Sequence, residues 1–142
     1  MQISQKGLDI LKEFEGLRLE AYRCSAGVWT IGYGWTQNVK RGDVWTREKA
    51  EHMLLEGVKP YEKAVQEAIG DAKTSQNQYD AMVSLCYNIG PGNFKKSSVA
   101  RLHREGKYAQ AAAAFMMWIK SKNRIIGGLI KRRNKEKVLY SS

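Results

Sequence analysis

The sequence has few of the features that mark a membrane protein, an exported protein or a metalloprotein. No apolar run approaches the roughly 20 residues needed to cross a bilayer, so we expect no transmembrane segment. Residues 1–7 contain no basic segment followed by an apolar one and no small-residue cleavage site, so no secretory signal is expected. His52 and His103 stand alone and are interpreted as exposed helix residues. With no Cys-x-x-Cys pattern, we predict neither a metal site nor a cofactor.

Cysteine is also scarce, with only Cys24 and Cys86 in the chain. We expect the protein to be made and folded in a cytoplasm, where two free thiols are favoured over a disulfide. Cys86 lies on the apolar face of a predicted helix and is assigned to the core. Cys24 is therefore the thiol that is available for chemistry.

Acidic residues are fewer than basic ones, and the imbalance is confined to one part of the chain. Residues 1–58 carry 8 Lys and Arg against 8 Asp and Glu, whereas residues 59–142 carry 16 against 6, giving a net charge of +10. Such a surface suits a polyanion, which could be nucleic acid, an anionic membrane or the acidic components of a bacterial wall. A non-catalytic basic module that binds nucleic acid or membrane is therefore one hypothesis.

A different hypothesis follows from the first third of the chain. Apolar residues at Ile10, Leu11 and Phe14 recur with helical period and place Glu15 on the last turn of a helix, beside a buried stripe. A carboxyl group at that place can be partly desolvated, which raises its pKa and lets it donate a proton near neutral pH. Glu15 is therefore a candidate general acid.

The residues that follow this helix predict a β-hairpin. The apolar and polar residues alternate, turn at 25–27 and continue as a second strand over 28–33, so that Cys24 lies at the turn and Thr30 on the returning strand. Each of these residues taken alone is more often structural. A hairpin packed against the helix end would bring Glu15, Cys24 and Thr30 to one wall of a cleft. A carboxylic acid, a thiol and a hydroxyl are groups that acid/base or nucleophilic hydrolysis can use.

The spacing of this set resembles a known signature. Glu15, eight residues, Cys24, five residues and Thr30, followed by Ile-Gly-Tyr-Gly at 31–34, is similar to the catalytic signature of the phage-type lysozymes, glycoside hydrolase family 24. The middle position of that family is Asp in most members and Cys in some. The likeness continues at residues 76–90, which resemble the core helix of the family, and at 128–133, which resemble its C-terminal motif.

The resemblance implies an α+β fold, mostly α, in a single lysozyme-like domain. It implies a small β-containing lobe at about 15–58 and a helical lobe at about 59–142, with the N-terminal helix packed on the latter. We interpret residues 46–69 as the connector helix, with Thr46 as its N-cap.

The function that the resemblance implies is hydrolysis of the β-1,4 bond between N-acetylmuramic acid and N-acetylglucosamine in peptidoglycan. The protein would be a monomeric phage endolysin, made in the host cytoplasm and admitted to the periplasmic wall by a holin. Its partner would be peptidoglycan and not nucleic acid, with contact to an anionic membrane through the basic C-terminal region.

The resemblance also assigns roles to residues. Glu15 would be the acid, and the Cys24 thiolate would either activate water with help from Thr30 or attack carbon directly, giving inversion or retention respectively. A second set of residues, at the end of the core helix and after the loop around Phe94, is expected to contact substrate. These residues are Tyr87, Asn88 and Ser97.

Two further positions carry expectations from the same source. One arginine of the pair Arg132 and Arg133 is expected to hold Glu15 in place. Trp35 stands where many members have His, and Gly57 where a partnering Asp is common, so a His–carboxylate pair is expected to be absent. We expect Trp35 to replace this pair by packing or to widen the contact with sugar.

The remaining chain is predicted to be helical. Ser75 is expected to cap the core helix, and the Gly-Pro-Gly at 90–92 to end it. Further helices are predicted over 97–105 and 108–120, and Pro60 is expected either to kink the connector or to open a second segment.

Overall fold

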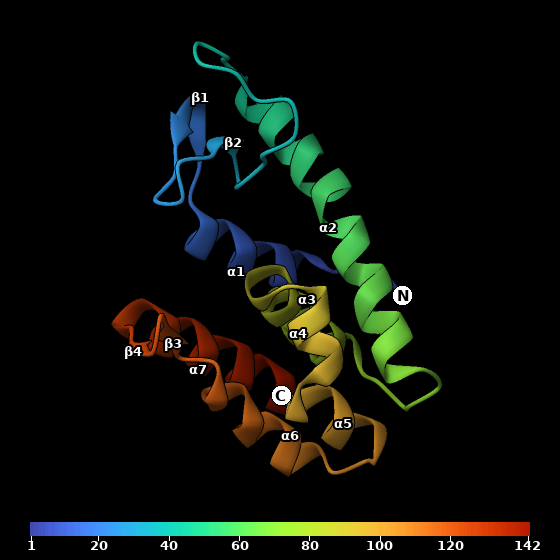
Figure 1. The fold of residues 1–142 in the computed structure, drawn as a ribbon. Helices are drawn as coiled ribbons and strands as arrows, with labels where there is room; N and C mark the ends of the chain where they lie inside the picture. Colours follow the sequence, from blue (N-terminus) through green and yellow to red (C-terminus); the bar gives the residue numbers. More distant parts are fainter. The chain divides into compact units, whose positions relative to one another are not determined.

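The structure, a computed structural model, describes all residues from 1 to 142 (Figure 1). It confirms the predicted α+β class, mostly α, with short two-stranded antiparallel sheets. The elements are α1 (Gln5–Glu15), β1 (Arg18–Arg23), β2 (Trp29–Gly32), α2 (Arg47–Ile69), α3 (Gln76–Ile89), α4 (Pro91–Lys96), α5 (Ser98–Arg104), α6 (Tyr108–Ala114), a 3₁₀ turn η1 (Phe115–Met117), β3 (Lys120–Ser121), β4 (Arg124–Ile125) and α7 (Gly127–Ser141).

The chain divides into two compact units. The hairpin unit comprises residues 11–59, and the helical unit comprises residues 1–10 and 60–142. The boundaries fall inside α1 and α2, so each of these helices contributes one part to each unit. No helix is both long enough and apolar enough to cross a membrane.

The hairpin unit contains the predicted hairpin. Strands β1 and β2 pair antiparallel, and the turn is closed by the Cys24 amide, which donates to the Val28 carbonyl at 3.0 Å, and by the Gly27 amide, which donates to the Cys24 carbonyl at 2.8 Å. The prediction of Cys24 at the turn and Thr30 on the returning strand is confirmed. Thr46 caps α2, accepting from the Lys49 amide at 3.1 Å, as predicted.

A small apolar core holds the hairpin unit together. It is formed by buried side chains from α1, β2 and α2: Leu11, Ile31, Ala50, Leu54 and Val58. Burial of a Val, Leu or Ile side chain is worth roughly 1.5–3 kcal/mol, so the four larger side chains stabilise the packing of this unit.

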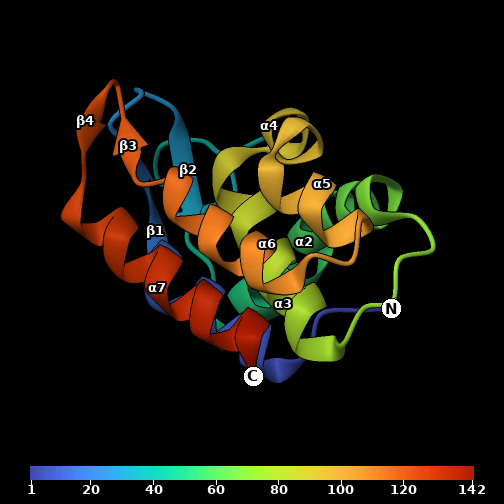
Figure 2. The same cartoon turned by 90° about the horizontal axis from the view of Figure 1, so that it is seen from below.

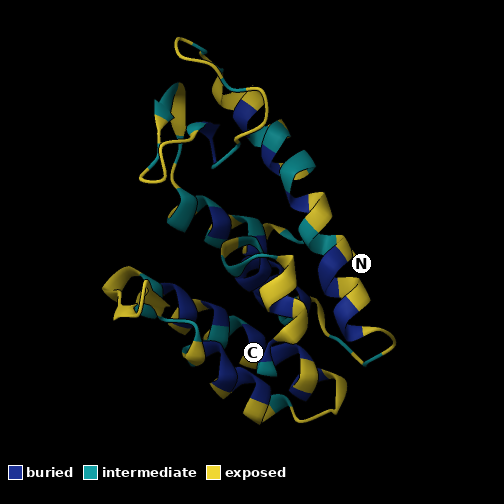
Figure 3. Cartoon of the chain, viewed as in Figure 1, coloured by how far each residue is buried: buried dark blue, intermediate teal, exposed yellow.

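The helical unit is built around α3. Residues 79–86 of this helix are all buried, so it is surrounded by its neighbours (Figure 3). It packs against α7, which also contacts α6 (Figure 2). The predicted cap is confirmed, since Ser75 and Gln78 form a reciprocal capping box, and the helix ends at Gly90, which has φ +92°.

The N-terminal residues are anchored on α3 through Asp80. The Ser4 amide donates to Asp80 Oδ1 at 2.9 Å, and the Ser4 hydroxyl donates to the other carboxylate oxygen. Gly7 lies so close that a Cβ atom there would be 2.9 Å from the Asp80 Cβ. The first turns of α1 therefore depend on a small residue at position 7.

The prediction of one helix over 108–120 is wrong beyond its second turn. Helix α6 ends at Ala114, and the chain continues through η1 into a short hairpin whose turn residues, Lys122 and Asn123, have φ of +50° and +64°. In the sequence, the helical repeat of apolar residues continues past Ala114. However, Phe115 packs on the ring of Tyr140 at a centroid distance of 5.4 Å, a tertiary contact that the local pattern does not contain.

Two other local predictions need correction, and one alternative is decided. Phe94 lies in helix α4 rather than a loop, because Pro91 starts a new helix directly after Gly90. His103 is buried, not exposed, because hydroxyls from distant segments satisfy both ring nitrogens. Pro60 lies inside α2, which continues to Ile69 as one helix.

Candidate active site

The first candidate residue lies at the end of α1. Glu15 is the last residue of this helix and is half-buried. The helix ends there because Gly16 has φ +71°, and the Gly16 amide donates to the Lys12 carbonyl at 3.1 Å. The chain then turns directly into β1, so the carboxyl group and the hairpin belong to the same unit.

The second candidate, Cys24, lies in an environment that favours its thiolate. It is a free and partly exposed thiol at the hairpin turn. Hydrogen bonds from the backbone at Val28 and Ala26 lower the pKa of the Cys24 thiol; burial opposes them, and the Thr30 side chain adds a smaller lowering effect. A lowered pKa enlarges the thiolate fraction at neutral pH.

Thr30 is the buried neighbour of this thiol. Its side chain is 4% exposed, and its hydroxyl donates to the Val28 carbonyl at 3.0 Å. The hydroxyl has a single proton, so it can serve either this carbonyl or the Cys24 sulfur at one time. Rotation about the Cβ–Oγ bond of Thr30 turns this proton from the carbonyl towards the sulfur. Thr30 can therefore donate a hydrogen bond to the Cys24 thiolate.

A polar cluster beside this set was not predicted from the sequence. Lys12 of α1 forms an ion pair with Glu51 of α2, and the Tyr33 hydroxyl donates to the same carboxylate at 3.2 Å. The Lys12 contact lowers the pKa of Glu51, whereas burial and the nearby carboxylate raise the pKa of Tyr33. The cluster ties the last turn of α1, which carries Glu15, to β2 and α2.

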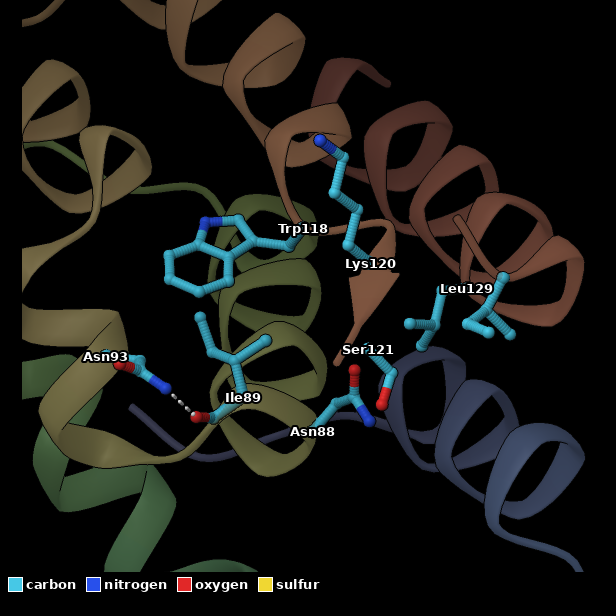
Figure 4. Close-up of a pocket in the computed structure, with 8 residues that line it drawn as sticks. Asn88, Ile89, Asn93, Trp118, Lys120, Ser121 and Leu129 are labelled. Atoms are coloured by element: carbon cyan, nitrogen blue, oxygen red, sulfur yellow. Dashed lines mark hydrogen bonds between the residues drawn. The ribbon is translucent and has the colours of Figure 1, made fainter. Parts of the chain in front are cut away.

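In the helical unit, Asn88 lines a pocket of about 520 Å³ (Figure 4). The indole of Trp118 lies over Ile89, and the Asn93 amide donates to the Ile89 carbonyl at 2.8 Å. The other residues that line the pocket come from the short hairpin and the start of α7: Lys120, Ser121, Ile126 and Leu129. Sequence reasoning found Asn88 alone, because the pocket gathers residues from five separate segments.

The two other expected substrate contacts lie elsewhere in the helical unit. Tyr87 is half-buried and packs on Tyr61 with ring centroids 4.7 Å apart. Ser97 is buried and caps α5, accepting from the Ala100 amide at 3.1 Å and donating to the Phe94 carbonyl at 2.6 Å. Neither residue lines the pocket around Asn88.

Both arginines of the C-terminal motif are buried on α7. They share the buried carboxylate of Glu136, with Arg132 Nε at 3.2 Å and Arg133 Nε at 2.9 Å from its oxygens. Arg133 also donates to Asn88 Oδ1 at 2.7 Å. This contact orients the Asn88 amide at the pocket, and it depends on Glu136, a residue that the sequence analysis did not single out.

Comparison with known proteins identifies the family and the fold of the chain. Residues 12–136 match the family described as phage lysozyme. The chain is 45% identical over 146 residues to the endolysin of Acyrthosiphon pisum secondary endosymbiont phage 1, covering 100% of this chain and 99% of that one. It is 41% identical to the endolysin of Bacillus phage PZA, but spans only 56% of that protein. Among solved structures, the muramidase domain of SpmX from Asticaccaulis excentricus superimposes with a TM-score of 0.93 at 37% identity, covering 99% and 98% of the two chains.

The chain belongs to the phage lysozyme family. It is a muramidase, a glycoside hydrolase that acts on peptidoglycan in the lysis of a phage host. The non-catalytic basic module is not favoured by these relatives.

Proposed function

We propose that Glu15, Cys24 and Thr30 are the catalytic set of this muramidase. The observation that carries the proposal is the lowered pKa of the Cys24 thiol, which lies beside the Thr30 hydroxyl in the unit that also holds Glu15. A thiolate at the hairpin turn supplies the second group that glycoside hydrolysis requires beside an acid.

In the proposed reaction, Glu15 protonates the oxygen of the leaving sugar as the bond from this oxygen to the anomeric carbon breaks. A water molecule forms the new bond to that carbon, and its proton passes to the Cys24 thiolate. Thr30 accepts from the same water while its own proton is held by the Val28 carbonyl. Proton exchange with solvent restores both groups, and the product has the inverted configuration.

Two measurements test this mechanism. Glu15→Gln should abolish hydrolysis of isolated sacculi while circular dichroism and the thermal midpoint stay at the wild-type values, because only the transferable proton is lost. NMR of the first soluble product should show the inverted anomer. Hydrolysis retained by the variant would refute the role of Glu15, and a retained anomer would mean that Cys24 attacks carbon directly.

We further propose that the pocket around Asn88 binds the sugar rings of the substrate. The aromatic face of Trp118 and the amides of Asn88 and Asn93 suit a pyranose that carries an N-acetyl group. Asn88→Ala should raise KM on sacculi with little change in kcat. An unchanged KM would exclude this contact. Tyr87 and Ser97 remain expectations from the family likeness, as does support of Glu15 by Arg132 or Arg133.

The route to the wall and contact with membranes are also proposals. We propose that a monomer made in the cytoplasm reaches the wall after a holin opens the membrane, and that the basic C-terminal region touches anionic lipid. Support for lipid contact comes from Ile125, which is 62% exposed, follows Arg124 and pairs with Lys120 across the short hairpin. Export in cells without a holin would refute the first proposal, and failure to bind phosphatidylglycerol vesicles at low salt would refute the second.

A further inference from the structure

The hairpin unit contains a second pocket, of about 480 Å³, that the proposed mechanism does not use. Neither Glu15, Cys24 nor Thr30 lines it. The lining residues that matter for its chemistry are Ile31, Trp35, Gln37, Asn38, Asp43 and Trp45.

This pocket lies on the other face of the hairpin from Thr30. Thr30 and Ile31 are consecutive residues of β2, and consecutive side chains of a strand point to opposite faces. Ile31 lines the pocket, so the Thr30 side chain points away from it. A ligand in this pocket would leave the catalytic set free.

Two tryptophans form walls of the pocket, and a glycine backs each of them. A Cβ atom at Gly57 would lie 3.4 Å from Trp35 Cε3, and one at Gly32 would lie 2.8 Å from Trp45 Cζ3. The Trp35 indole is further fixed because its Nε1–H donates to the Gln37 carbonyl at 2.9 Å. The ring centroids are 6.3 Å apart at 51°, so the indoles are held as two inclined faces.

The rest of the lining mixes polar and apolar side chains: Val39, Val44 and Met53 are apolar, and the Lys49 ammonium lies 5.2 Å from the centroid of the Trp45 ring. Gln37 and Asn38 bring amides that both donate and accept, and Asp43 keeps acceptor capacity after its Oδ2 accepts from the Lys40 amide at 2.8 Å. Aromatic faces beside convergent amides and a carboxylate match a pyranose, whose C–H face packs on an indole while its hydroxyl and acetamido groups form hydrogen bonds.

We propose that this Trp35–Trp45 pocket is a second, non-catalytic binding site for the N-acetylhexosamine chain of peptidoglycan. It holds a glycan strand against one face of the hairpin while the catalytic set acts from the other. The proposal goes beyond the proposed function and rests on it only for the identity of the polymer. Trp35 packed on Gly57 and Trp45 packed on Gly32 are the residues that form its aromatic walls.

The test compares a polymeric with a short substrate. Trp35→His combined with Gly57→Asp removes the indole wall, and Gln37→Ala combined with Asn38→Gly removes the amides. Glycine suits position 38, where φ is +56°. For each variant we expect KM on sacculi to rise about fivefold, in the range that loss of an aromatic contact or of a hydrogen bond produces. Activity on a soluble tetrasaccharide, too short to reach both faces, should be unchanged.

Leu55→Ala is the control, because Leu55 is an exposed residue of the same unit that does not line the pocket. It should leave both activities unchanged. If the first pair does not fold, the amide pair still decides the question, since Gln37 and Asn38 are exposed. Wild-type KM on sacculi for the folded pocket variants would overturn the proposal. Failure of the catalytic proposal is seen separately, as activity of Glu15→Gln on the tetrasaccharide.

A direct measurement completes the test. Titration with chitotetraose, followed by NMR of the four indole N–H signals, should shift those of Trp35 and Trp45. In the amide pair, Gln37→Ala with Asn38→Gly, these shifts should need at least several-fold more sugar. If the Trp35 and Trp45 signals stay fixed while others move, the sugar binds elsewhere and the proposal is wrong.

Discussion

The two thiols of the chain lie in opposite environments at the residue scale. Cys24 is partly exposed with a lowered pKa, whereas Cys86 is completely buried in α3 and burial raises its pKa to about 12. Only the thiolate is nucleophilic, so reactivity follows both differences. Cys86 is therefore a slowly reacting thiol in the same molecule, with which the reaction rate of Cys24 can be compared.

We predict that iodoacetamide at pH 7 modifies Cys24 at least about tenfold faster than Cys86, because accessible thiolate is present only at Cys24. Mass spectrometry of peptides at timed intervals measures both rates, and hydrolysis of sacculi should fall in step with Cys24 modification. Cys24→Asp should hydrolyse sacculi and resist the reagent. Equal rates at the two cysteines would contradict the prediction.

Trp35 and Gly57 form a second residue-scale pair. A Cβ at Gly57 would lie 3.4–3.5 Å from the Trp35 ring, which is ordinary contact, but a carboxylate beyond that Cβ would press on the indole. We predict that Gly57→Asp destabilises the protein by about 1–3 kcal/mol, as overpacking does. In the Trp35→His background this cost should disappear, giving a coupling of about 1 kcal/mol or more.

Urea unfolding of the four proteins of this cycle measures the coupling. Gly57→Ala is the matched control, and it should be neutral or stabilising, because its methyl group fits and alanine favours a helix by about 1 kcal/mol over glycine. Additive effects of the two substitutions would mean that the positions do not interact.

At the scale of the element, helix α3 depends on its capping box. Ser75 accepts from the Gln78 amide at 3.0 Å, while the Gln78 side chain accepts from the Ser75 amide at 2.9 Å. Since α3 is the centre of the helical unit, its first turn is linked to the stability of that unit.

We predict that Ser75→Ala lowers the free energy of unfolding by about 1 kcal/mol, because the Gln78 amide loses its partner while the Ser75 backbone amide keeps the Gln78 side chain. Ser141→Ala is the control, since Ser141 is exposed on the last turn of α7, and it should change the free energy by less than about 0.5 kcal/mol. Chemical denaturation measures both values. Equal small effects would show that solvent replaces the cap.

At the scale of the whole molecule, a buried histidine links stability to pH. The ring nitrogens of His103 lie 2.8 Å from the Thr74 hydroxyl and 2.6 Å from the Tyr140 hydroxyl, so three distant segments meet at this imidazole. Burial lowers the pKa of His103 below its usual value. The folded protein therefore binds fewer protons at this residue than the unfolded chain in mildly acid solution.

We predict that this residue makes stability fall as pH decreases below about 6.5, the unfolded value, at up to about 1.4 kcal/mol per pH unit. About one pH unit or more above 6.5, this site is almost entirely neutral in both states and the dependence disappears. Urea unfolding from pH 5 to 8 measures the slope, which should be reduced in His103→Gln and unchanged in His52→Gln, because His52 is exposed. An identical slope in His103→Gln would refute the link.

The sequence by itself determined the features that depend on neighbouring residues. Glycine at position 16 ends α1 directly after Glu15, and alternation places Cys24 and Thr30 on a hairpin, because backbone conformation and strand period are local properties. Ser75 was likewise recognisable as a cap. The fold class and the candidate set followed from such signals together with the family likeness.

Only the tertiary structure decided which distant residues meet. It buried His103 between Thr74 and Tyr140, ended α6 at Ala114, and seated Trp35 on Gly57. None of these outcomes has a local signature, because each depends on contacts between segments that are far apart in the chain. Cys24 depends on both the sequence and the tertiary structure. The sequence pattern placed the thiol at a turn, and hydrogen bonds from the folded backbone around it lower its pKa.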